Sequence, residues 1–377
     1  MTPLRITVFT RSYPSADDLY QYPFVHRRVL AYAAAGHEVQ VVRPSTEPGL
    51  TEHRFDGVRC LTGDGPALAG AIAKFAPDVI AAHGISEVQW PILTASAGTV
   101  PVCNWLHGSE IPAIARGKAA LDLSGDALLA AQRVIEARCS FWHDLLAAER
   151  VRLCTVSMAA REMTRPDWGH RADRLAVVPN PIDTDLFAFE EKGPDDRFNI
   201  LMIRPFDSRG YGNDMAVDAI RLLAGQPGFS RLTFTIVGDG PLFEETLSPI
   251  RDLPNVRAHR GFLTQSEIAA LHRRHGIFLV PTRLDTQGVS RDEAMSSGLV
   301  PVTNAIPAVL EFADDACAAL AEPESPASIA AQLWSLIDDP VLFCGKSRAA
   351  GARVQAQSSA DLVIPRELSL LEDACRG

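Results

Sequence analysis

The sequence has few of the features that mark disulfide-stabilised, membrane-spanning or nucleic-acid-binding proteins. Its seven cysteines are odd in number and scattered without a C-x-x-C spacing, so neither a disulfide framework nor a zinc site is indicated. No run approaches the ~20 apolar residues needed to cross a bilayer, and the first apolar run ends at Thr10 without the features of a signal peptide. The net charge of −10 argues against broad attraction to nucleic acid. We therefore expect a cytoplasmic protein that contacts a membrane at most peripherally, at its inner face.

The length and composition favour a globular chain of two domains. Hydrophobic residues make up 47% of the 377 residues and charged residues 22%, which is the balance of a compact globular protein. A chain of this length exceeds what one hydrophobic core usually serves. A cleft between two domains would then be available to a ligand.

Strand-like and helix-like segments alternate through the first half of the chain. β-branched runs at residues 6–9 and 38–42 flank an amphipathic stretch at 25–35, which is the pattern of a βαβ unit. Further strands are expected at 79–82, 100–104, 151–156 and 175–178, and a helix over 127–148. The first half is therefore expected to form a parallel sheet flanked by helices.

The alternation stops at the charged run EEKGPDDR, residues 190–197, and then starts again. Strands are expected at 199–203, 232–237, 256–259, 277–281 and 300–303. Helix starts are indicated by Thr264 and Glu267, which fit a capping box, and by Ser325 followed by Pro326. We place the domain boundary at 190/191, with a second domain over 191–365.

The strongest motif is RLDTQGVSRDEAMSSGLVPVT, residues 283–303, which follows an expected strand. Asp285 lies in the loop after that strand, where open α/β sheets bind ligands, and Glu293 falls in the first turns of the next helix. Carboxylates at such a place can bind hydroxyl groups. Two plainer interpretations exist: Ser290 and Glu293 fit an S-x-x-E capping box, and Asp285 fits an ordinary turn.

This segment resembles the acidic–seven residues–Glu motif of family four glycosyltransferases, with Asp285 where the usual residue is Glu. The same family is matched in order by AAAGHEVQVV at 33–42, NWLHGSE at 104–110, VVPNPIDTDLF at 177–187 and VGDGP at 237–241. The resemblance implies the α/β GT-B architecture, in which two Rossmann-like parallel-sheet domains face each other across a cleft. It also implies a metal-independent enzyme, without cofactor, that retains the anomeric configuration of the sugar.

The resemblance implies a nucleotide diphosphate sugar as donor, bound by the second domain. Asp285 would contact the donor sugar and Glu293 the ribose, while Arg204 and Arg209 in RPFDSRG would neutralise the diphosphate. The plainer interpretation of both arginines is an exposed loop. The donor site would be completed by the free amides of Thr286, Gln287, Gly288 and Val289 and by Gly238 and Gly240.

The resemblance places His107, at the end of an expected strand, near the anomeric carbon of the donor. There it would support the transition state and position the acceptor; a single histidine is otherwise more often structural. No enzyme nucleophile is required if the departing phosphate oxygen takes the acceptor proton. Other residues expected on the acceptor side or in the cleft are Tyr13, Tyr22, His83, Gly108 and Asn180.

Two further features bear on the family assignment. The glycine-rich loop that the family has after its first strand is absent, since no glycine lies between Phe9 and Val25. Asp183-Thr184-Asp185 spells a D-x-D, but it lies within a turn that matches the metal-independent family. The resemblance also implies that a helix over 366–375 packs back on the first domain.

The function expected from this resemblance is sugar transfer to a glycan, lipid-linked or small-molecule acceptor, in bacterial surface polysaccharide or glycoconjugate synthesis. The alternatives are another GT-B enzyme, such as a nucleotide-sugar epimerase or a natural-product glycosyltransferase, and a non-catalytic nucleotide-sugar-binding subunit. A dinucleotide-dependent oxidoreductase would need G-x-G-x-x-G after the first strand, which FTRSYPS does not supply. The base and the sugar of the donor are not identified by the sequence.

Overall fold

The computed structural model describes residues 3–146 and 151–376, and these residues form two compact units. The first comprises the described residues up to Ala119, Ser124–Pro181 and those from Ala360 onward; the second comprises Ala120–Leu123 and Ile182–Ser359. The units thus divide at 181/182 and not at 190/191. The charged run is anchored in the second unit because Lys192 is buried there and its Nζ donates to the carbonyl of His272 at 2.8 Å.

The first unit is built on an eight-stranded sheet in the order β3-β4-β2-β1-β5-β6-β7-β8. Its parallel strands are β1 (Arg5–Thr10), β2 (Glu38–Pro44), β4 (Val58–Gly63), β5 (Val79–His83), β6 (Val102–Leu106), β7 (Val151–Thr155) and β8 (Ala176–Val177). β5 and β6 are buried along their whole length, as expected for strands covered on both faces. Their carboxyl ends carry His83 and the residues that follow Leu106.

A hairpin at the edge of this sheet was not expected from the sequence. β3 (Leu50–Phe55) pairs antiparallel with β4. The two residues between them, Asp56 and Gly57, have φ angles of 48° and 77°, which is the backbone of a tight type I′ turn. The sheet is therefore mixed at this edge and parallel elsewhere.

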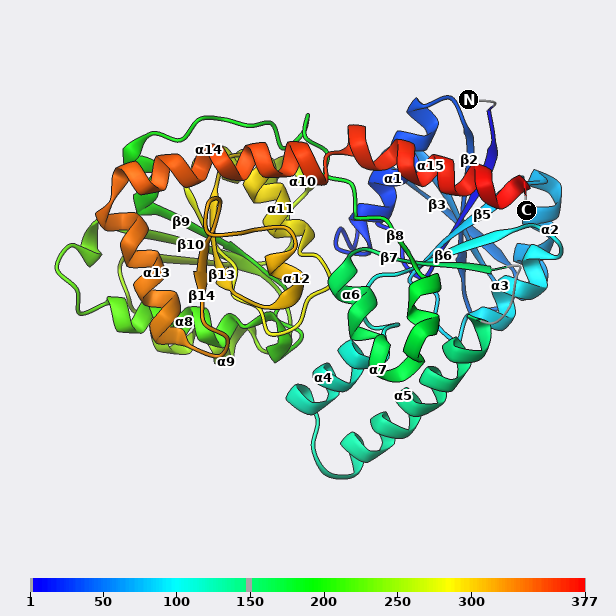
Figure 1. Cartoon of the computed structure of the whole chain (residues 1–377), viewed down its shortest axis with the longest axis horizontal. Coiled ribbons are helices and arrows are strands. Elements are labelled where there is room, and N and C mark those ends of the chain that lie inside the picture. Colours follow the sequence, from blue (N-terminus) through cyan, green and yellow to red (C-terminus); the bar gives the residue numbers. More distant parts are fainter. Residues whose placement is uncertain (1–2, 147–150, 377) are drawn as a thin grey trace. The chain divides into compact units, whose positions relative to one another are not determined.

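Helices of the first unit cover the sheet, and the last of them comes from the end of the chain (Figure 1). They are α1 (Pro23–Ala34), α2 (Gly65–Phe75), α3 (Trp90–Ala97), α4 (Pro112–Asp122), α5 (Gly125–Leu145), α6 (Met158–Met163), α7 (Arg165–Trp168) and α15 (Ala360–Arg376); the last three residues of α4 belong to the second unit. α15 contacts α1, β5 and β6. It begins six residues before the helix expected at 366–375, and its apolar face, including Leu368 and Leu371, packs into a core with Val25 and Val29 of α1.

The second unit is a six-stranded sheet in the order β11-β10-β9-β12-β13-β14, in which every pair of strands is parallel. The strands are β9 (Asn199–Ile203), β10 (Thr233–Gly238), β11 (Val256–Arg260), β12 (Ile277–Leu279), β13 (Val300–Asn304) and β14 (Ala319–Ala321). The helices are α8 (Asn213–Leu223), α9 (Phe243–Leu247), α10 (Gln265–Arg273), α11 (Val289–Ser296), α12 (Pro307–Leu310), α13 (Pro326–Asp338) and α14 (Pro340–Gln357). This is the strand–helix alternation expected for residues 199–303.

The helix starts of the second unit follow the sequence signals. Thr264 and Glu267 form the expected capping box at the start of α10, and the Ser325 side chain caps α13 ahead of Pro326. The two ends of the long segment of this unit also meet, because Ile182 and Ser359 form a parallel bridge and the Ile182 amide donates to the Ser358 carbonyl at 2.8 Å.

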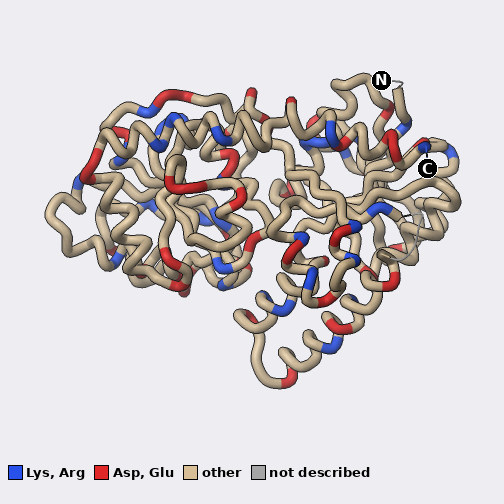
Figure 2. The backbone as a smooth tube through the Cα atoms, viewed as in Figure 1, with Lys and Arg blue, Asp and Glu red and all other residues tan. Residues whose placement is uncertain are grey.

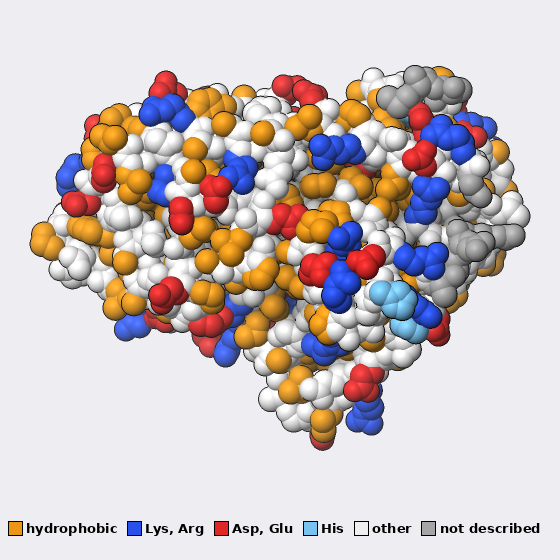
Figure 3. All heavy atoms as spheres, viewed as in Figure 1, with side chains coloured by type: hydrophobic (Ala, Val, Ile, Leu, Met, Phe, Trp, Pro, Cys, Tyr) orange, Lys and Arg blue, Asp and Glu red, His pale blue; other side chains and the backbone are white. Residues whose placement is uncertain are grey.

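Charged residues of both signs are interspersed along the chain (Figure 2). The face shown in Figure 3 likewise mixes basic and acidic side chains with hydrophobic and neutral ones. None of the helices in the described residues is long and apolar enough to cross a membrane.

Candidate active site

The first unit holds two histidines in contact at the carboxyl ends of β5 and β6. His83 Nδ1 lies 3.1 Å from His107 Nε2, and the two rings stack with centroids 5.3 Å apart. The His83 ring also stacks on Trp105, at 4.9 Å. These strands are neighbours in the sheet, so two residues that are 24 apart in sequence meet at its edge. We refer to His83 and His107 as the histidine pair.

His83 was expected to line the cleft, and the structure does not support this. Its side chain is fully buried beneath His107 and Trp105, so it contacts His107 and not an acceptor. Only His107 of the pair is partly exposed. The role left to His83 is to fix the ring of His107.

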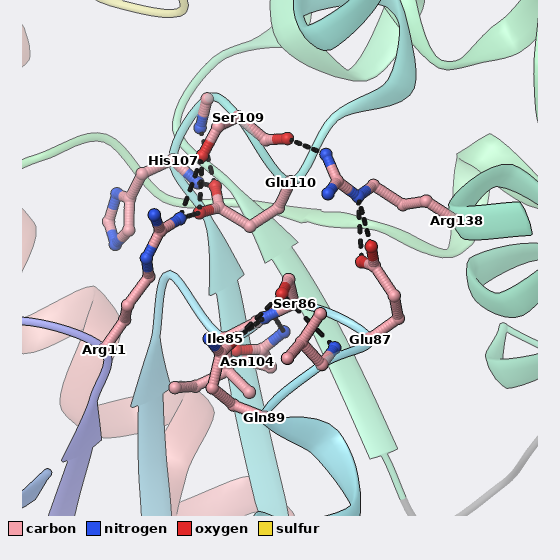
Figure 4. A network of polar contacts seen from close by, with 12 residues as sticks. Arg11, Ile85, Ser86, Glu87, Gln89, Asn104, His107, Ser109, Glu110 and Arg138 are labelled. Carbon is pink, nitrogen blue, oxygen red and sulfur yellow. Dashed lines mark hydrogen bonds and ion pairs between the residues drawn. The ribbon is translucent and has the colours of Figure 1, made fainter. Parts of the chain in front are cut away.

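The backbone that carries His107 is held by a buried carboxylate (Figure 4). Glu110 Oε2 accepts the amides of His107 and Gly108 at 3.1 and 3.0 Å. Arg11, which follows β1, has Nη1 3.9 Å from Glu110 Oε1 and 3.4 Å from the Ser109 hydroxyl. The turn His107–Glu110 is therefore held by hydrogen bonds to the Glu110 carboxylate, and Trp142 Nε1 donates to the Glu110 carbonyl at 3.1 Å.

A buried arginine accompanies the histidine pair. Arg28 of α1 pairs with Glu367 of α15, with Nε 2.6 Å from Oε1, and both side chains are fully buried. Its Nη2 donates to Asn180 Oδ1 at 3.1 Å and its Nη1 to the carbonyl of Phe24 at 3.2 Å. Asn180, which was expected in the cleft, is 5% exposed and serves as an acceptor for Arg28.

The histidine pair is neutral at physiological pH. Burial, followed by the positive charge of Arg28, holds the pKa of His83 and of His107 well below the ordinary value for histidine. A neutral imidazole has one nitrogen that donates and one that accepts. His107 can therefore interact with a hydroxyl group without presenting a full positive charge.

The segment after β1, which lacks the family's glycines, reaches the histidine pair through aromatic side chains. Tyr22 has a left-handed backbone with φ 56°, and its ring lies so close to Gly84 that a β-carbon there would be 2.5 Å from the ring. Its ring centroid lies 6.2 Å from that of His107, and the Phe24 ring lies 4.7 Å from it. The rings of Tyr22 and Phe24 thus pack against His107.

Tyr13 was also expected on the acceptor side, and this expectation is wrong. Its side chain is 1% exposed, and its hydroxyl is 2.6 Å from His26 Nδ1. It belongs to the core that also contains Val25 and Val29. A tyrosine in this apolar setting packs and contacts no acceptor.

In the second unit, two glycines allow the loop after β9 to approach β10. A β-carbon at Gly238 would lie 2.0 Å from the carbonyl oxygen of Arg204, and one at Gly240 would lie 2.4 Å from the carbonyl carbon of Phe206. Side chains at these positions would push the loop away. Gly238 and Gly240 therefore act by letting the arginine loop pack closely.

Arg204 is buried at this place and its hydrogen bonding is incomplete. Its Nη2 donates to the carbonyls of Tyr211 and Pro281 at 3.2 and 3.4 Å. Its Nε has no hydrogen-bond partner among the described residues. Burial lowers the pKa of Arg204, and the charge of Asp285 opposes that effect. A buried cation with an unused donor is suited to an anionic ligand.

Arg209 is exposed, on the short 3₁₀ turn Arg209–Tyr211. It lines a cavity of about 310 Å³ together with Ser208 and Asp214. Arg283 fixes this turn, since its Nη1 donates to the Arg209 carbonyl at 2.8 Å and also pairs with Asp214 at 2.7 Å. The backbone under Arg209 is held in place while its side chain projects outward.

Asp285 organises the loop of residues 285–288, which we call the donor loop. Its Oδ1 accepts the amides of Thr286 and Gln287 at 2.8 and 3.1 Å. These two amides were expected to be free for a diphosphate, and the structure shows instead that they bind Asp285. Gly288, with φ 96°, ends the loop as the N-cap of α11, and the amides of Gly288 and Val289 have no acceptor among the described residues.

Glu293 is partly exposed on α11. The helix begins at Val289 and its N-cap is Gly288, without a side-chain cap. Ser290 is inside the helix, so the capping-box interpretation of Ser290 and Glu293 is wrong. A ligand-binding role for Glu293 stays a prediction.

Beneath the donor loop lies a buried polar network that the sequence reasoning missed. Arg291 pairs with Asp292 at 2.7 Å, and both side chains are almost fully buried. Arg291 Nη2 donates to the Gln287 carbonyl at 2.5 Å, and Gln287 Nε2 donates to Asp292 Oδ2 at 3.1 Å. The family motif drew attention to Asp285 and Glu293 and not to the charged residues between them.

The D-x-D is part of a turn. Asp183 Oδ1 accepts the amide of Leu186 at 2.9 Å. Among the described residues there is no cluster of three or more histidine, cysteine or acidic side chains arranged to hold a metal ion. The structure thus gives Asp183 a local structural role.

Two sequence profiles match the chain one after the other. Residues 23–186 match Glycosyltransferase Family 4, and residues 197–339 match Glycosyl transferases group 1. The chain belongs to the group 1 glycosyltransferases. His107, Arg204 and Asp285 all lie within the matched ranges.

This group 1 glycosyltransferase also resembles individual proteins along its length. It is 26% identical over 369 residues to glycogen synthase of Mycobacterium tuberculosis strain H37Rv, a match that covers 88% of this chain and 85% of that protein. Sucrose-phosphate synthase from Thermosynechococcus elongatus has the same fold, with a TM-score of 0.76, 17% identity and 98% of both chains covered. HepE of Anabaena, solved with UDP and glucose, gives a TM-score of 0.73 at 14% identity, with 98% of this chain and 100% of that one covered.

Proposed function

We propose that this glycosyltransferase moves a sugar from a nucleotide diphosphate donor to an acceptor hydroxyl with retention of anomeric configuration and without a metal ion. The donor is assigned to the second unit and the acceptor-side chemistry to the first. The observation that carries the proposal is Arg204, a buried cation with an unused Nε donor near the carboxylate of Asp285.

The second unit suits a donor that combines negative charge with hydroxyl groups. Arg204 and Arg209 would stabilise the diphosphate as it leaves, because positive charge in a desolvated site lowers the energy of a developing anion. Asp285 Oδ1 holds the donor loop, and within the described part of the chain no hydrogen bond is found to Oδ2, so Oδ2 would accept a sugar hydroxyl. Glu293 would bind the ribose hydroxyls.

The reaction needs no group on the enzyme that forms a covalent bond. The bond between the anomeric carbon and the phosphate oxygen breaks, and the acceptor oxygen bonds to the same face of that carbon. The departing phosphate oxygen takes the acceptor proton. His107, kept neutral by burial and by Arg28, would position the acceptor and support the charge that develops at the sugar.

The relatives support sugar transfer onto a carbohydrate or related acceptor. Their names describe glycogen, sucrose-phosphate and trehalose-phosphate synthases, and two solved neighbours hold UDP with glucose or UDP-glucose. We propose a glycan, lipid-linked or small-molecule acceptor, in the synthesis of a bacterial surface polysaccharide or glycoconjugate.

A donor panel tests the proposal. UDP, GDP and ADP and their hexoses are added in turn, and binding is detected as an increase in the thermal midpoint, since a ligand that binds only the folded state stabilises it. The preferred donor is then incubated with candidate acceptors in the presence of EDTA, and the anomeric configuration of the product is read by NMR. Inversion, or a strict need for a divalent metal, would contradict the mechanism.

The Asp285→Asn variant separates sugar recognition from nucleotide binding. Asparagine keeps an oxygen for the amides of Thr286 and Gln287, so the donor loop should keep its shape. We expect donor use to fall while the affinity for the free nucleoside diphosphate stays close to that of the wild type. Equal weakening of both would show that Asp285 does not act on the sugar.

A further inference from the structure

We propose that Arg28 is a positioning residue for the histidine pair and that Glu367, on the C-terminal helix, holds Arg28 in its position. This inference rests on the proposed role of His107 in transfer. It extends the site to the last helix of the chain, which carries none of the family motifs.

The first step is the fixed position of Arg28. Its guanidinium is bound on three sides: by Glu367 at 2.6 Å, by Asn180 at 3.1 Å and by the Phe24 carbonyl at 3.2 Å. The side chains of Arg28 and Glu367 have no exposed area. A guanidinium with partners in a fork of this kind has one position available to it.

The second step is the mechanical link from Arg28 to His107. Arg28 holds the carbonyl of Phe24, and the Phe24 ring packs on the His107 ring with centroids 4.7 Å apart. On its other edge, His107 contacts His83 at 3.1 Å. Arg28 Cζ also lies 6.0 Å from the centroid of the Phe24 ring, so the imidazole of His107 contacts both a ring that packs near Arg28 and a buried histidine.

Arg28 also acts on the histidine pair through its positive charge. Arg28 acts on both members of the pair, and burial followed by its positive charge holds the pKa of each histidine low. The other charged groups near the pair are Glu110, which accepts the His107 amide, Arg11, which pairs with Glu110, and Glu367. Of these charged groups, Arg28 is the one whose charge lowers the pKa of both histidines.

A double variant distinguishes positioning from simple structural support. Arg28→Met with Glu367→Met replaces the ion pair by apolar side chains of similar length, a change that buried pairs often tolerate without loss of stability. We expect this variant to fold with a thermal midpoint close to that of the wild type. Arg116→Met with Asp167→Leu, which removes a pair of the same unit with a 2.6 Å contact, is the matched control.

The first measurement follows the histidines and needs no substrate. In protein labelled with ¹³C-histidine, the resonances of His83 and His107 are assigned with His83→Gln and His107→Gln variants and followed against pH. Removal of the cation removes the repulsion that opposes protonation, so both resonances should titrate at higher pH in the Arg28/Glu367 variant than in the wild type or the control. An unchanged titration overturns the proposal.

The second measurement is transfer. We expect kcat of the Arg28/Glu367 variant to fall by about 10²-fold, the size typical of a misplaced catalytic group, with an unchanged KM for the donor and an acid limb of the pH profile moved to higher pH. Wild-type kcat in a folded double variant would overturn the proposal. If the wild-type chain transfers no sugar from any donor, the proposed function fails, and the titration still decides whether Arg28 governs the pair.

Discussion

Each unit contains a buried ion pair next to the residues assigned to the reaction, and the two pairs are built in opposite ways. Arg291 and Asp292 are adjacent in the sequence and lie on the first turns of α11. Arg28 and Glu367 are separated by 339 positions and join α1 to α15. One pair shapes a single loop, whereas the other ties the two ends of the chain together. A long-range pair of this kind makes the first unit depend on the C-terminus, which the second unit does not.

The largest effect should come from breaking the long-range pair on one side only. Glu367→Ala leaves Arg28 charged and buried without its carboxylate, and breaking a buried pair in this way costs about 3–5 kcal/mol. Glu38→Ala, which removes the partner of Arg5 from an exposed pair, should cost about 0–1 kcal/mol. Urea unfolding of both variants measures the difference, and equal losses would show that the buried pair is not important to the fold.

A second comparison separates the catalytic rate, which we assign to the first unit, from nucleotide binding, which we assign to the second. His107→Ala removes a group of the first unit that we propose acts at the reacting centre, so we expect kcat to fall by about 10²–10³-fold. Nucleotide affinity should hardly change, because the donor residues lie in the second unit. Calorimetry and steady-state kinetics give the two readouts, with the exposed His170 replaced by alanine as control. Weakened nucleotide binding would place His107 in a different role.

The two arginines of the second unit can be compared directly. Charge-assisted hydrogen bonds contribute about 1.5–3 kcal/mol, so alanine at Arg204 or Arg209 should weaken nucleoside diphosphate binding by roughly 10- to 150-fold. The nucleoside itself should bind normally. Arg209→Lys should keep much activity because an exposed point charge suffices, whereas Arg204→Lys should not, because its buried fork of donors is lost. Equal weakening of nucleoside, monophosphate and diphosphate would contradict the assignment.

The smallest expected effect is a change in the pH dependence of stability. Burial lowers the pKa of His272 to about 3, below its value in the unfolded chain. The unfolded state then binds more protons as the pH falls below about 6.5, so the stability that His272 contributes above that pH is progressively lost in acid. His272→Gln should flatten the slope of the unfolding free energy between pH 6 and 4 by about 1.4 kcal/mol per pH unit. An unchanged slope would show that this histidine is protonated in the folded protein.

Local patterns in the sequence predicted most of the parallel strands and the helix caps at Thr264 and Ser325, but they did not predict the parallel strands β4 and β14. The hairpin of β3 and β4 was missed although Asp56-Gly57 is a strong turn signal, since β3 is mostly exposed and lacks an apolar face. The division between the units was misplaced because a charged run resembles a linker, while the burial of Lys192 depends on the distant α10.

Candidate site residues could be named from the sequence where a motif contains them, but contacts between residues that are far apart in the sequence could not be predicted. Motifs assigned roles to His107, Asp285 and Arg204, and these roles stay predictions, whereas the contact between His83 and His107 required the pairing of β5 with β6. Nothing in the sequence around Arg28 or Glu367 indicates that they meet. Tyr13 was misassigned because an aromatic residue after the first strand suits a binding loop and a core equally well.

The bridge between Ile182 and Ser359 has a consequence for synthesis of the chain. Residues 182–359 form a segment whose two ends meet, so they can complete a sheet and its covering helices as soon as they have left the ribosome. Domains generally fold in the order in which they are translated. In this chain the first unit is translated first but is completed only when α15 has been made, because Arg28 has no carboxylate partner until Glu367 emerges. The enzyme thus finishes its first unit last, and a nascent chain stalled before residue 367 would carry a folded donor unit and an unfinished histidine site.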